Sequence, residues 1–124
     1  MSSSAKPAAP AMVERTCFDK SKALRPKVHS VIPGGAHTYA KGDDQYPELS
    51  PGFIERGKGC HIWDVDGNEF IEYGMGLRAV TLGHAYPSVI EAAYRQMQLG
   101  NNFNRLAPIE LECAQMLQSL VPSA

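Results

Sequence analysis

The chain has 124 residues and a formal net charge of -1, with 44% hydrophobic and 20% charged residues. This size fits one small domain, and the balanced charge gives no sign of the basic surface that binds nucleic acid or anionic membranes. No apolar run is long enough to span a membrane, so neither membrane nor nucleic acid is expected as a partner. The three scattered cysteines favour reduced thiols in a cytoplasmic protein over a disulfide framework.

The first part of the chain predicts a tail, a helix and a long loop. Residues 1–20 lack the apolar core of a signal peptide and are expected to form a disordered tail. Apolar residues at helical spacing predict a helix over residues 21–32, in which Pro26 either lies in the first turn or causes a kink. The polar stretch that follows, residues 36–52, is long for a structureless loop, so we expect it to be functional or disordered.

The stretch "WDVDGNEFIEY" begins with the oxygen ligands of a calcium loop, at Asp64, Asp66 and Asn68. An EF-hand loop that began at Asp64 would need glycine at its sixth position and a bidentate glutamate at its twelfth. Those two positions hold Glu69 and Met75. The sharp turn and the strongest ligand are therefore both missing, and a calcium site is not expected.

The same stretch fits a β-hairpin better. The Asp-Gly pair at 66–67 predicts a type I′ turn, in which both central residues have positive φ. Alternating apolar and polar residues predict strands at about 60–65 and 68–73, and a further strand is expected within "FIERGKG", residues 53–59. A hairpin is marginal by itself in water, so these strands must pack on another element.

Two amphipathic helices are predicted in the last third of the chain. Pro87 is well placed for the first turn of one helix and Gly100 for its end, while Pro108 opens a second helix that ends before Pro122. The expected fold is therefore a small α+β unit made of a helix, a three-stranded antiparallel β unit and two amphipathic helices. Its core would be thin, because both late helices need an apolar partner that this chain hardly supplies.

Several polar residues invite a catalytic interpretation that the pattern does not favour. Cys60 and His61 look like a nucleophile and its base, but neighbours on a strand point to opposite faces of the sheet. His84, in "LGHAYP", is expected to satisfy backbone groups at the start of the following helix. Asp64 and Asp66 are most simply acidic residues of the turn and the strand edge.

The motifs "IPGG", "WDVDGNEFIEY" and "LGHAYP" together resemble the N-terminal part of the class III pyridoxal-phosphate-dependent aminotransferases. The family shows an "IPGG" helix end, a "W-D-x-D-G-x-x-[YF]-[IL]-D" hairpin and an "L-G-H-x-x-P" helix start. The stretch "PIELECAQMLQSLVP" is similar to a later helix of the family, so the resemblance runs from about Ser21 to the end. The pattern is most similar to the glutamate-1-semialdehyde aminomutase branch.

The resemblance implies a fold type I enzyme of the α/β class, of which residues 21–124 would be the N-terminal segment. Such an enzyme binds pyridoxal 5'-phosphate and moves an amino group between an amino donor and a carbonyl acceptor, or within one substrate, and it is a homodimer. The phosphate-binding turn and the Schiff-base lysine of the family would lie beyond Ala124. Lys41 and Lys58 lack the family's lysine context, so the chain alone is expected to be inactive.

The resemblance also implies four substrate-pocket positions, of which Thr38 and Lys41 lie in the polar loop. Thr38 falls where the aminomutase branch has serine in "G-G-V-N-S-P-V-R", and Lys41 falls on the arginine of that motif. The arginine resembles a contact to a substrate carboxylate, which a lysine could bind as a point charge but not as a bidentate fork. The alternative is that Lys41 is a solvated loop residue.

Leu77 and Arg78 are the other two positions. Leu77 falls where the branch carries tryptophan in "S-W-G-P", beside the cofactor ring, and this departure implies a wider or reshaped pocket. Arg78 falls where the pattern has glycine, so a long cation could bind a carboxylate or phosphate of a different substrate. The alternative is an arginine that pairs with a surface acid.

Two other hypotheses remain open for the whole chain. A stand-alone, non-catalytic module would bind a partner through its unpartnered apolar faces and would be a folded, soluble species. One half of a split enzyme would regain activity only when it is mixed with a second chain. The N-terminal portion of a single longer enzyme is the leading interpretation.

Overall fold

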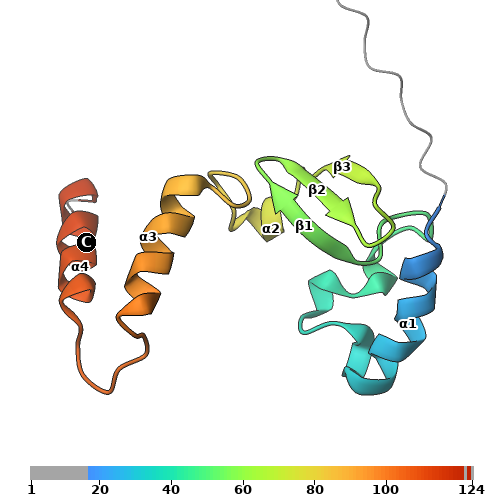
Figure 1. The fold of residues 1–124 in the computed structure, drawn as a ribbon, viewed down its shortest axis with the longest axis horizontal. Coiled ribbons are helices and arrows are strands. Elements are labelled where there is room, and N and C mark those ends of the chain that lie inside the picture. The colour runs from blue at the N-terminus through green and yellow to red at the C-terminus, as the bar shows by residue number, and fades with distance from the viewer. Residues whose placement is uncertain (1–16, 122, 124) are drawn as a thin grey trace, which may run out of the picture. The chain divides into compact units, whose positions relative to one another are not determined.

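The structure is a computed structural model, and it describes residues 17–121 and 123. These residues form a helix, three short 3-10 turns, three strands, one tight turn and two further helices (Figure 1). The chain divides into two compact units, with the boundary between His84 and Ala85. Most of the tail expected at the N-terminus lies outside the described residues.

Helix α1, Asp19–Val31, begins two residues before the expected start. The reason is a contact that is distant in sequence: the carboxylate of Asp66 accepts hydrogen bonds from the backbone N–H groups of Lys20 and Ser21, at 2.8 and 3.1 Å. Asp66 thereby satisfies two donors that a helix start leaves free, and it ties the helix to the hairpin. Pro26 lies in the middle of α1 and not in its first turn.

The polar loop, residues 36–52, contains short turns and is not structureless. The 3-10 turn η1, Pro33–Gly35, precedes this loop, and the loop itself contains η2, Tyr39–Lys41, and η3, Asp43–Gln45. The carboxylate of Asp43 contacts Nε of Arg25 at 2.5 Å and Nε2 of His29 at 3.0 Å, so the loop is tied back to α1. The hydrogen bond from His29 is the main reason that the pKa of Asp43 lies below its ordinary value, and the nearby charge of Arg25 lowers it further.

The three strands are β1 Ile54–Lys58, β2 His61–Asp64 and β3 Glu69–Ile71. They form one antiparallel sheet in the order β1-β2-β3, as the sequence predicts. The apolar side chains buried among the described residues are Phe18, just before α1, and Ile62 in the central strand. Because so little apolar surface is enclosed, polar contacts carry much of the order in this unit.

The turn between β2 and β3 differs from the expected type I′ turn, so that prediction is wrong. The backbone N–H of Gly67 donates to the Asp64 carbonyl at 3.0 Å, and the Asp64 N–H donates to the Asn68 carbonyl at 3.1 Å. The loop therefore has three residues, 65–67, and only Gly67 among them has a positive φ, of 89°. This is the pattern of a turn followed by a glycine bulge.

The side chain of Asp64 explains why this longer loop is preferred. Its carboxylate is fully buried and accepts hydrogen bonds from the backbone N–H groups of Asp66 and Asn68, at 3.0 and 2.8 Å. It also accepts from the side-chain amide of Asn68 at 2.9 Å. A two-residue turn would not bring these three donors to one carboxylate.

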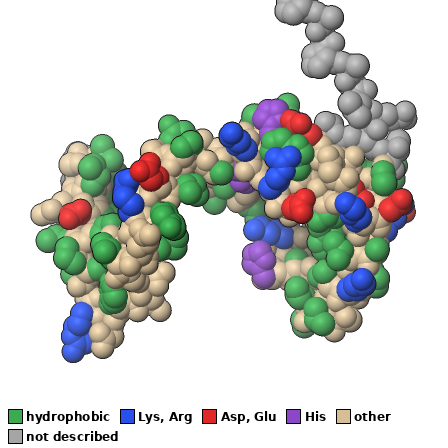
Figure 2. All heavy atoms as spheres, viewed as in Figure 1, with side chains coloured by type: hydrophobic (Ala, Val, Ile, Leu, Met, Phe, Trp, Pro, Cys, Tyr) green, Lys and Arg blue, Asp and Glu red, His purple; other side chains and the backbone are tan. Residues whose placement is uncertain are grey.

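The second unit contains helices α3, Pro87–Gln98, and α4, Pro108–Leu120, which confirm the two predicted amphipathic helices. Their large apolar residues are exposed in the structure, among them Ile90, Tyr94, Met116 and Leu117. Figure 2 shows apolar side chains spread over the surface of these helices. No helix in the described part of the chain is long and apolar enough to cross a membrane.

We predict that Asp64→Ala lowers the free energy of unfolding by about 2 to 3 kcal/mol, because the substitution leaves three part-buried donors without this acceptor. The exposed Glu55 in β1 provides a control, and Glu55→Ala should change the free energy of unfolding little. Urea unfolding followed by circular dichroism measures both. Equal losses for the two variants would contradict the role assigned to Asp64.

Candidate functional site

The most unusual backbone in the structure lies at α2, Met75–Arg78, which carries two of the predicted pocket residues. The φ angles of Met75, Gly76, Leu77 and Arg78 are 40°, 58°, 59° and 71°, so the turn is left-handed throughout. For residues other than glycine this conformation costs roughly 1 to 2 kcal/mol each. Such a turn persists only where surrounding contacts fix it, and backbone of this kind is concentrated at functional sites.

The side chain of Glu72 supplies one of these contacts. Its Oε1 accepts a hydrogen bond from the backbone N–H of Gly76 at 2.9 Å, inside the left-handed turn. Its Oε2 contacts Nε2 of His84, and both side chains are about one-quarter exposed. The Glu72 carboxylate therefore binds the turn through Gly76 and also contacts His84, which lies twelve positions later in the chain.

His84 is in turn fixed to the sheet, so the expectation that it satisfies the start of the next helix is wrong. Its backbone N–H donates to the Gly59 carbonyl at 2.8 Å, and the Gly59 N–H donates to the His84 carbonyl at 2.9 Å. Its ring lies against Gly57, where an added Cβ would come within 2.7 Å of the His84 Cγ. At Gly83 an added Cβ would lie 3.0 Å from the Gly59 Cα, so this approach also requires glycine.

The electrostatics of Glu72 connect the turn to the polar loop. Burial is the strongest influence on the pKa of Glu72 and raises it, but the hydrogen bonds from Gly76 and His84 and the charges of His84 and Lys41 outweigh it. The pKa of Glu72 consequently lies below its ordinary value of 4.5. Lys41 therefore acts on the same carboxylate that holds the turn with Leu77 and Arg78.

The four residues predicted for a substrate pocket all lie in the first unit and are all exposed. The backbone N–H of Lys41 donates to the Thr38 carbonyl at 3.0 Å, so these two residues share one 3-10 turn. Leu77 and Arg78 occupy the left-handed turn, and half of the Leu77 side chain is exposed. The Arg78 guanidinium has neither an ion pair nor a hydrogen bond with any residue that the structure describes.

The Glu72–His84 pair was not predicted from the sequence as part of the site. The sequence showed only an acidic residue at the end of a predicted strand and a histidine within "LGHAYP". Nothing in the local pattern links positions twelve residues apart, because the link depends on the bridge between Gly59 and His84. Only the fold brings the carboxylate, the ring and the turn together.

Other polar groups are less suited to chemistry. His61 pairs through Nδ1 with Glu69 at 2.7 Å on the exposed part of the hairpin, and Cys60 is exposed beside it. Both remaining cysteines are also free and exposed. Within residues 17–121 and 123, no group of three His, Cys, Asp or Glu side chains is arranged to hold a metal ion.

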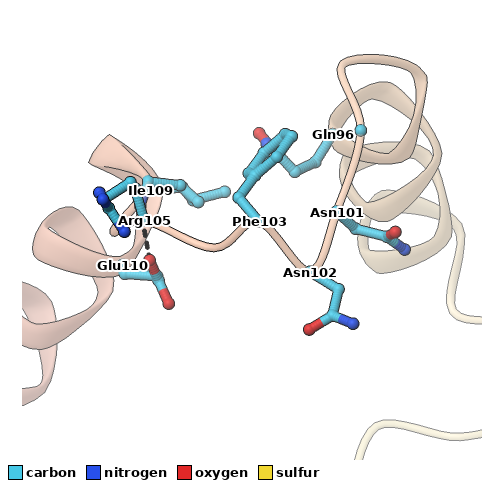
Figure 3. A pocket seen from close by; sticks show the side chains of 9 residues that line it. Gln96, Asn101, Asn102, Phe103, Arg105, Ile109 and Glu110 are labelled. Atoms are coloured by element: carbon cyan, nitrogen blue, oxygen red, sulfur yellow. Dashed lines mark hydrogen bonds between the residues drawn. The ribbon is translucent and has the colours of Figure 1, made fainter.

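The second unit contains a shallow hollow of about 210 Å³ in the connector between α3 and α4. Figure 3 shows its side chains, which come from the end of α3, the connector and the start of α4. Glu110 is engaged there, because its carboxylate accepts a hydrogen bond from the backbone N–H of Ala107 at 2.6 Å. The hollow therefore coincides with a helix cap, and it contains none of the four predicted pocket residues.

Comparison with known proteins identifies the family. The family described as "Aminotransferase class-III" matches residues 40–124, so this chain belongs to the class III aminotransferases. The glutamate-1-semialdehyde 2,1-aminomutase of Chloroflexus aggregans is 39% identical over 106 residues, which are 86% of this chain and 24% of that protein. The same enzyme of Acetivibrio thermocellus is 36% identical over 106 residues, which are 86% of this chain and 25% of that protein.

Solved structures agree with this assignment. A transaminase with bound PLP matches 85% of this chain and 24% of its own, with a TM-score of 0.75 and 30% identity. An omega-transaminase from Sphaerobacter thermophilus matches 83% of this chain and 23% of its own, with a TM-score of 0.73 and 31% identity. The chain thus spans about a quarter of the length of the relatives it matches. The α+β portion has the fold of the corresponding part of these transaminases.

We predict that Gly57→Ala destabilises the protein by about 1 to 3 kcal/mol, because its new Cβ would overlap the His84 ring. Gly74→Ala is the matched control, since Gly74 has a φ of -73° and an added Cβ there meets nothing within 4 Å. Thermal unfolding of both variants tests the contact. A Gly57→Ala protein as stable as Gly74→Ala would show that the ring does not occupy this position.

We also predict that stabilisation by Glu72 is lost in acid. Because the pKa of Glu72 is lower in the folded protein than its ordinary 4.5, this contribution is fully present above pH 4.5. It declines as the pH falls through the folded-state pKa. The difference in unfolding free energy between wild type and Glu72→Gln should therefore shrink as the pH falls below 4.5, as measured by urea unfolding at several pH values. A difference that is the same at pH 7 and in acid would contradict the pairing.

Proposed function

We propose that this chain is the N-terminal portion of a pyridoxal-phosphate-dependent aminotransferase or aminomutase. Membership of the class III aminotransferases supports the reaction class, and the match to a transaminase with bound PLP supports the cofactor. The substrates would be a small-molecule amino donor and a carbonyl acceptor, or one substrate whose amino group moves. When bound, the cofactor supplies the electron sink for the chemistry at the amino carbon, and the protein supplies binding and orientation.

The described residues do not fit the covalent anchor of this cofactor. A Schiff-base lysine is typically activated in a desolvated pocket, whereas Lys41 and Lys58 are exposed on this chain. We therefore assign neither lysine to the anchor and derive no catalytic step from them. The contribution of this chain to the proposed reaction is the recognition of the substrate.

The exposed side chain of Arg78 is the main observation that supports a role in substrate recognition. Its guanidinium is exposed and lacks a partner among residues 17–121 and 123, so the alternative of pairing with a surface acid of this chain gains no support. An unpaired arginine on a fixed turn can bind a carboxylate through two parallel hydrogen bonds. Leu77, next to it, adds an apolar surface for the remainder of the substrate. The proposed substrate therefore carries a carboxylate or phosphate group beside an apolar portion.

Lys41 and Thr38 are proposed as the second side of the same pocket. The charge of Lys41 acts on Glu72, which contacts the turn with Leu77 and Arg78, so the two halves of the predicted site are electrostatically linked. Part of the Lys41 charge is offset by Glu72. We therefore assign Lys41 a weaker contact with the substrate than Arg78 and expect Thr38 to contribute only through its hydroxyl.

We further propose that the complete enzyme is a homodimer and that other parts of it cover the exposed apolar faces of α3 and α4. Large apolar residues such as Ile90, Met97 and Leu117 are more than half exposed on this chain. Helix faces that expose several large apolar residues are often enclosed by other protein. The alternative of a stand-alone binding module would use the same faces for a separate partner.

Substitution of Arg78 tests the proposed role in recognition. In the full-length enzyme we predict that Arg78→Ala raises the KM for the carboxylate-bearing substrate about 10- to 100-fold, because a charge-assisted hydrogen-bond pair is lost. Arg78→Lys should restore part of this loss, since it keeps the charge without the fork. Arg95→Ala, which removes an exposed arginine paired with Glu91 on α3, is the control. Steady-state kinetics with unchanged KM in Arg78→Ala would exclude Arg78 from the pocket.

A further inference from the structure

We propose that Glu72 and His84 act together as a positioning pair that fixes the left-handed turn and thereby sets where Leu77 and Arg78 meet the substrate. This inference rests on the proposed function for its consequence in catalysis. Its structural part, that the pair holds the turn, stands on the contacts alone. Neither residue is assigned to bind the substrate or to transfer a proton.

The pair closes the segment between residues 72 and 84 into a loop with two fixed ends. Glu72 continues directly from β3, and its backbone N–H donates to the Cys60 carbonyl at 2.8 Å. His84 is joined to Gly59 by two backbone hydrogen bonds. The contact between the Glu72 and His84 side chains then links the two ends of the segment to each other. The segment that carries Leu77 and Arg78 cannot move as a whole without breaking one of these contacts.

The turn requires this support because its own hydrogen bonds are few. The Arg78 N–H donates to the Gly74 carbonyl at 2.8 Å, and the Val80 N–H donates to the Met75 carbonyl at 3.1 Å. Against them stands the cost of three residues other than glycine with positive φ. The Glu72 carboxylate adds a charge-assisted bond at the centre of the turn, on the N–H of Gly76. At Gly76 an added Cβ would also lie 2.9 Å from the Val80 side chain, so the turn has little room to rearrange.

Glutamate suits this position because its two oxygens perform two different tasks. Oε1 holds the turn, while Oε2 is held by His84. A glutamine can still accept the Gly76 hydrogen bond but loses the negative charge that attracts His84 and Lys41. An alanine loses both contacts. Glu72→Gln should therefore remove part of the support of the turn and Glu72→Ala all of it, and neither substitution adds bulk to the site.

The chain provides a matched control in a second Glu–His pair, which lies on the β2–β3 hairpin. Glu69 and His61 contact each other at 2.7 Å, and both are more exposed than Glu72 and His84. Among the residues that the structure describes, neither forms an ion pair or a ring contact with the left-handed turn. Removal of the Glu69–His61 pair should therefore reproduce the general cost of losing an ion pair on this sheet, with no effect on the turn.

The test measures hydrogen exchange and kinetics in the full-length protein. We expect Glu72→Ala to speed the backbone exchange of the peptide that contains residues 75–80 at least tenfold and to raise the KM of the carboxylate-bearing substrate with a smaller change in kcat. Glu72→Gln should restore part of both effects. His84→Gln should speed the same exchange, and Glu69→Ala should change neither quantity.

Two results would overturn the inference. Unchanged exchange at residues 75–80 in Glu72→Ala would show that the pair does not hold the turn. Faster exchange with an unchanged KM, or with a KM raised as much by Glu69→Ala, would show that the turn does not position the substrate. A wild-type protein with neither aminotransferase nor aminomutase activity would instead contradict the proposed function, and the exchange data would then decide alone whether the pair holds the turn.

Discussion

The buried carboxylate of Asp64 is the contact on which the first unit depends. It gathers three donors of the β2–β3 loop, and this arrangement directs Asp66 to the start of α1. The side-chain amide of Asn68 also donates to the Cys17 carbonyl at 2.9 Å, so the loop contacts the chain on both sides of Phe18. With few apolar side chains enclosed, this network substitutes for part of a hydrophobic core.

The sheet that this network fixes is the support for the candidate site. β2 is followed by β3 and Glu72, and the bridge between Gly59 and His84 joins the chain again to the connection between β1 and β2. The left-handed turn lies between these two fixed points, and it exposes Leu77 and Arg78, of which the arginine has no ion pair with a described residue. This is the surface that we propose for substrate recognition.

Much of the fold follows from local patterns, and the site follows less well. Prolines and glycines correctly placed α3 and α4, and alternation correctly placed the three strands. The type of the β2–β3 turn was wrong because the Asp-Gly signal competes with Asp64, whose carboxylate favours a three-residue loop. The left-handed turn was missed because three of its residues are not glycine, and propensity gives no reason to expect positive φ there. The partners of Glu72 and Asp66 were missed because they are distant in sequence.

We propose that a protein that carries this chain at the length of its relatives is a pyridoxal-phosphate enzyme whose covalent anchor lies outside these residues. The most direct measurement combines the intact mass of the purified protein with an absorbance scan between about 300 and 500 nm after addition of the cofactor. We expect a new aldimine band in the full-length protein and, after reduction with borohydride, a labelled lysine other than Lys41 and Lys58. A label on either of these lysines, or no band in a protein of full length, would contradict the account.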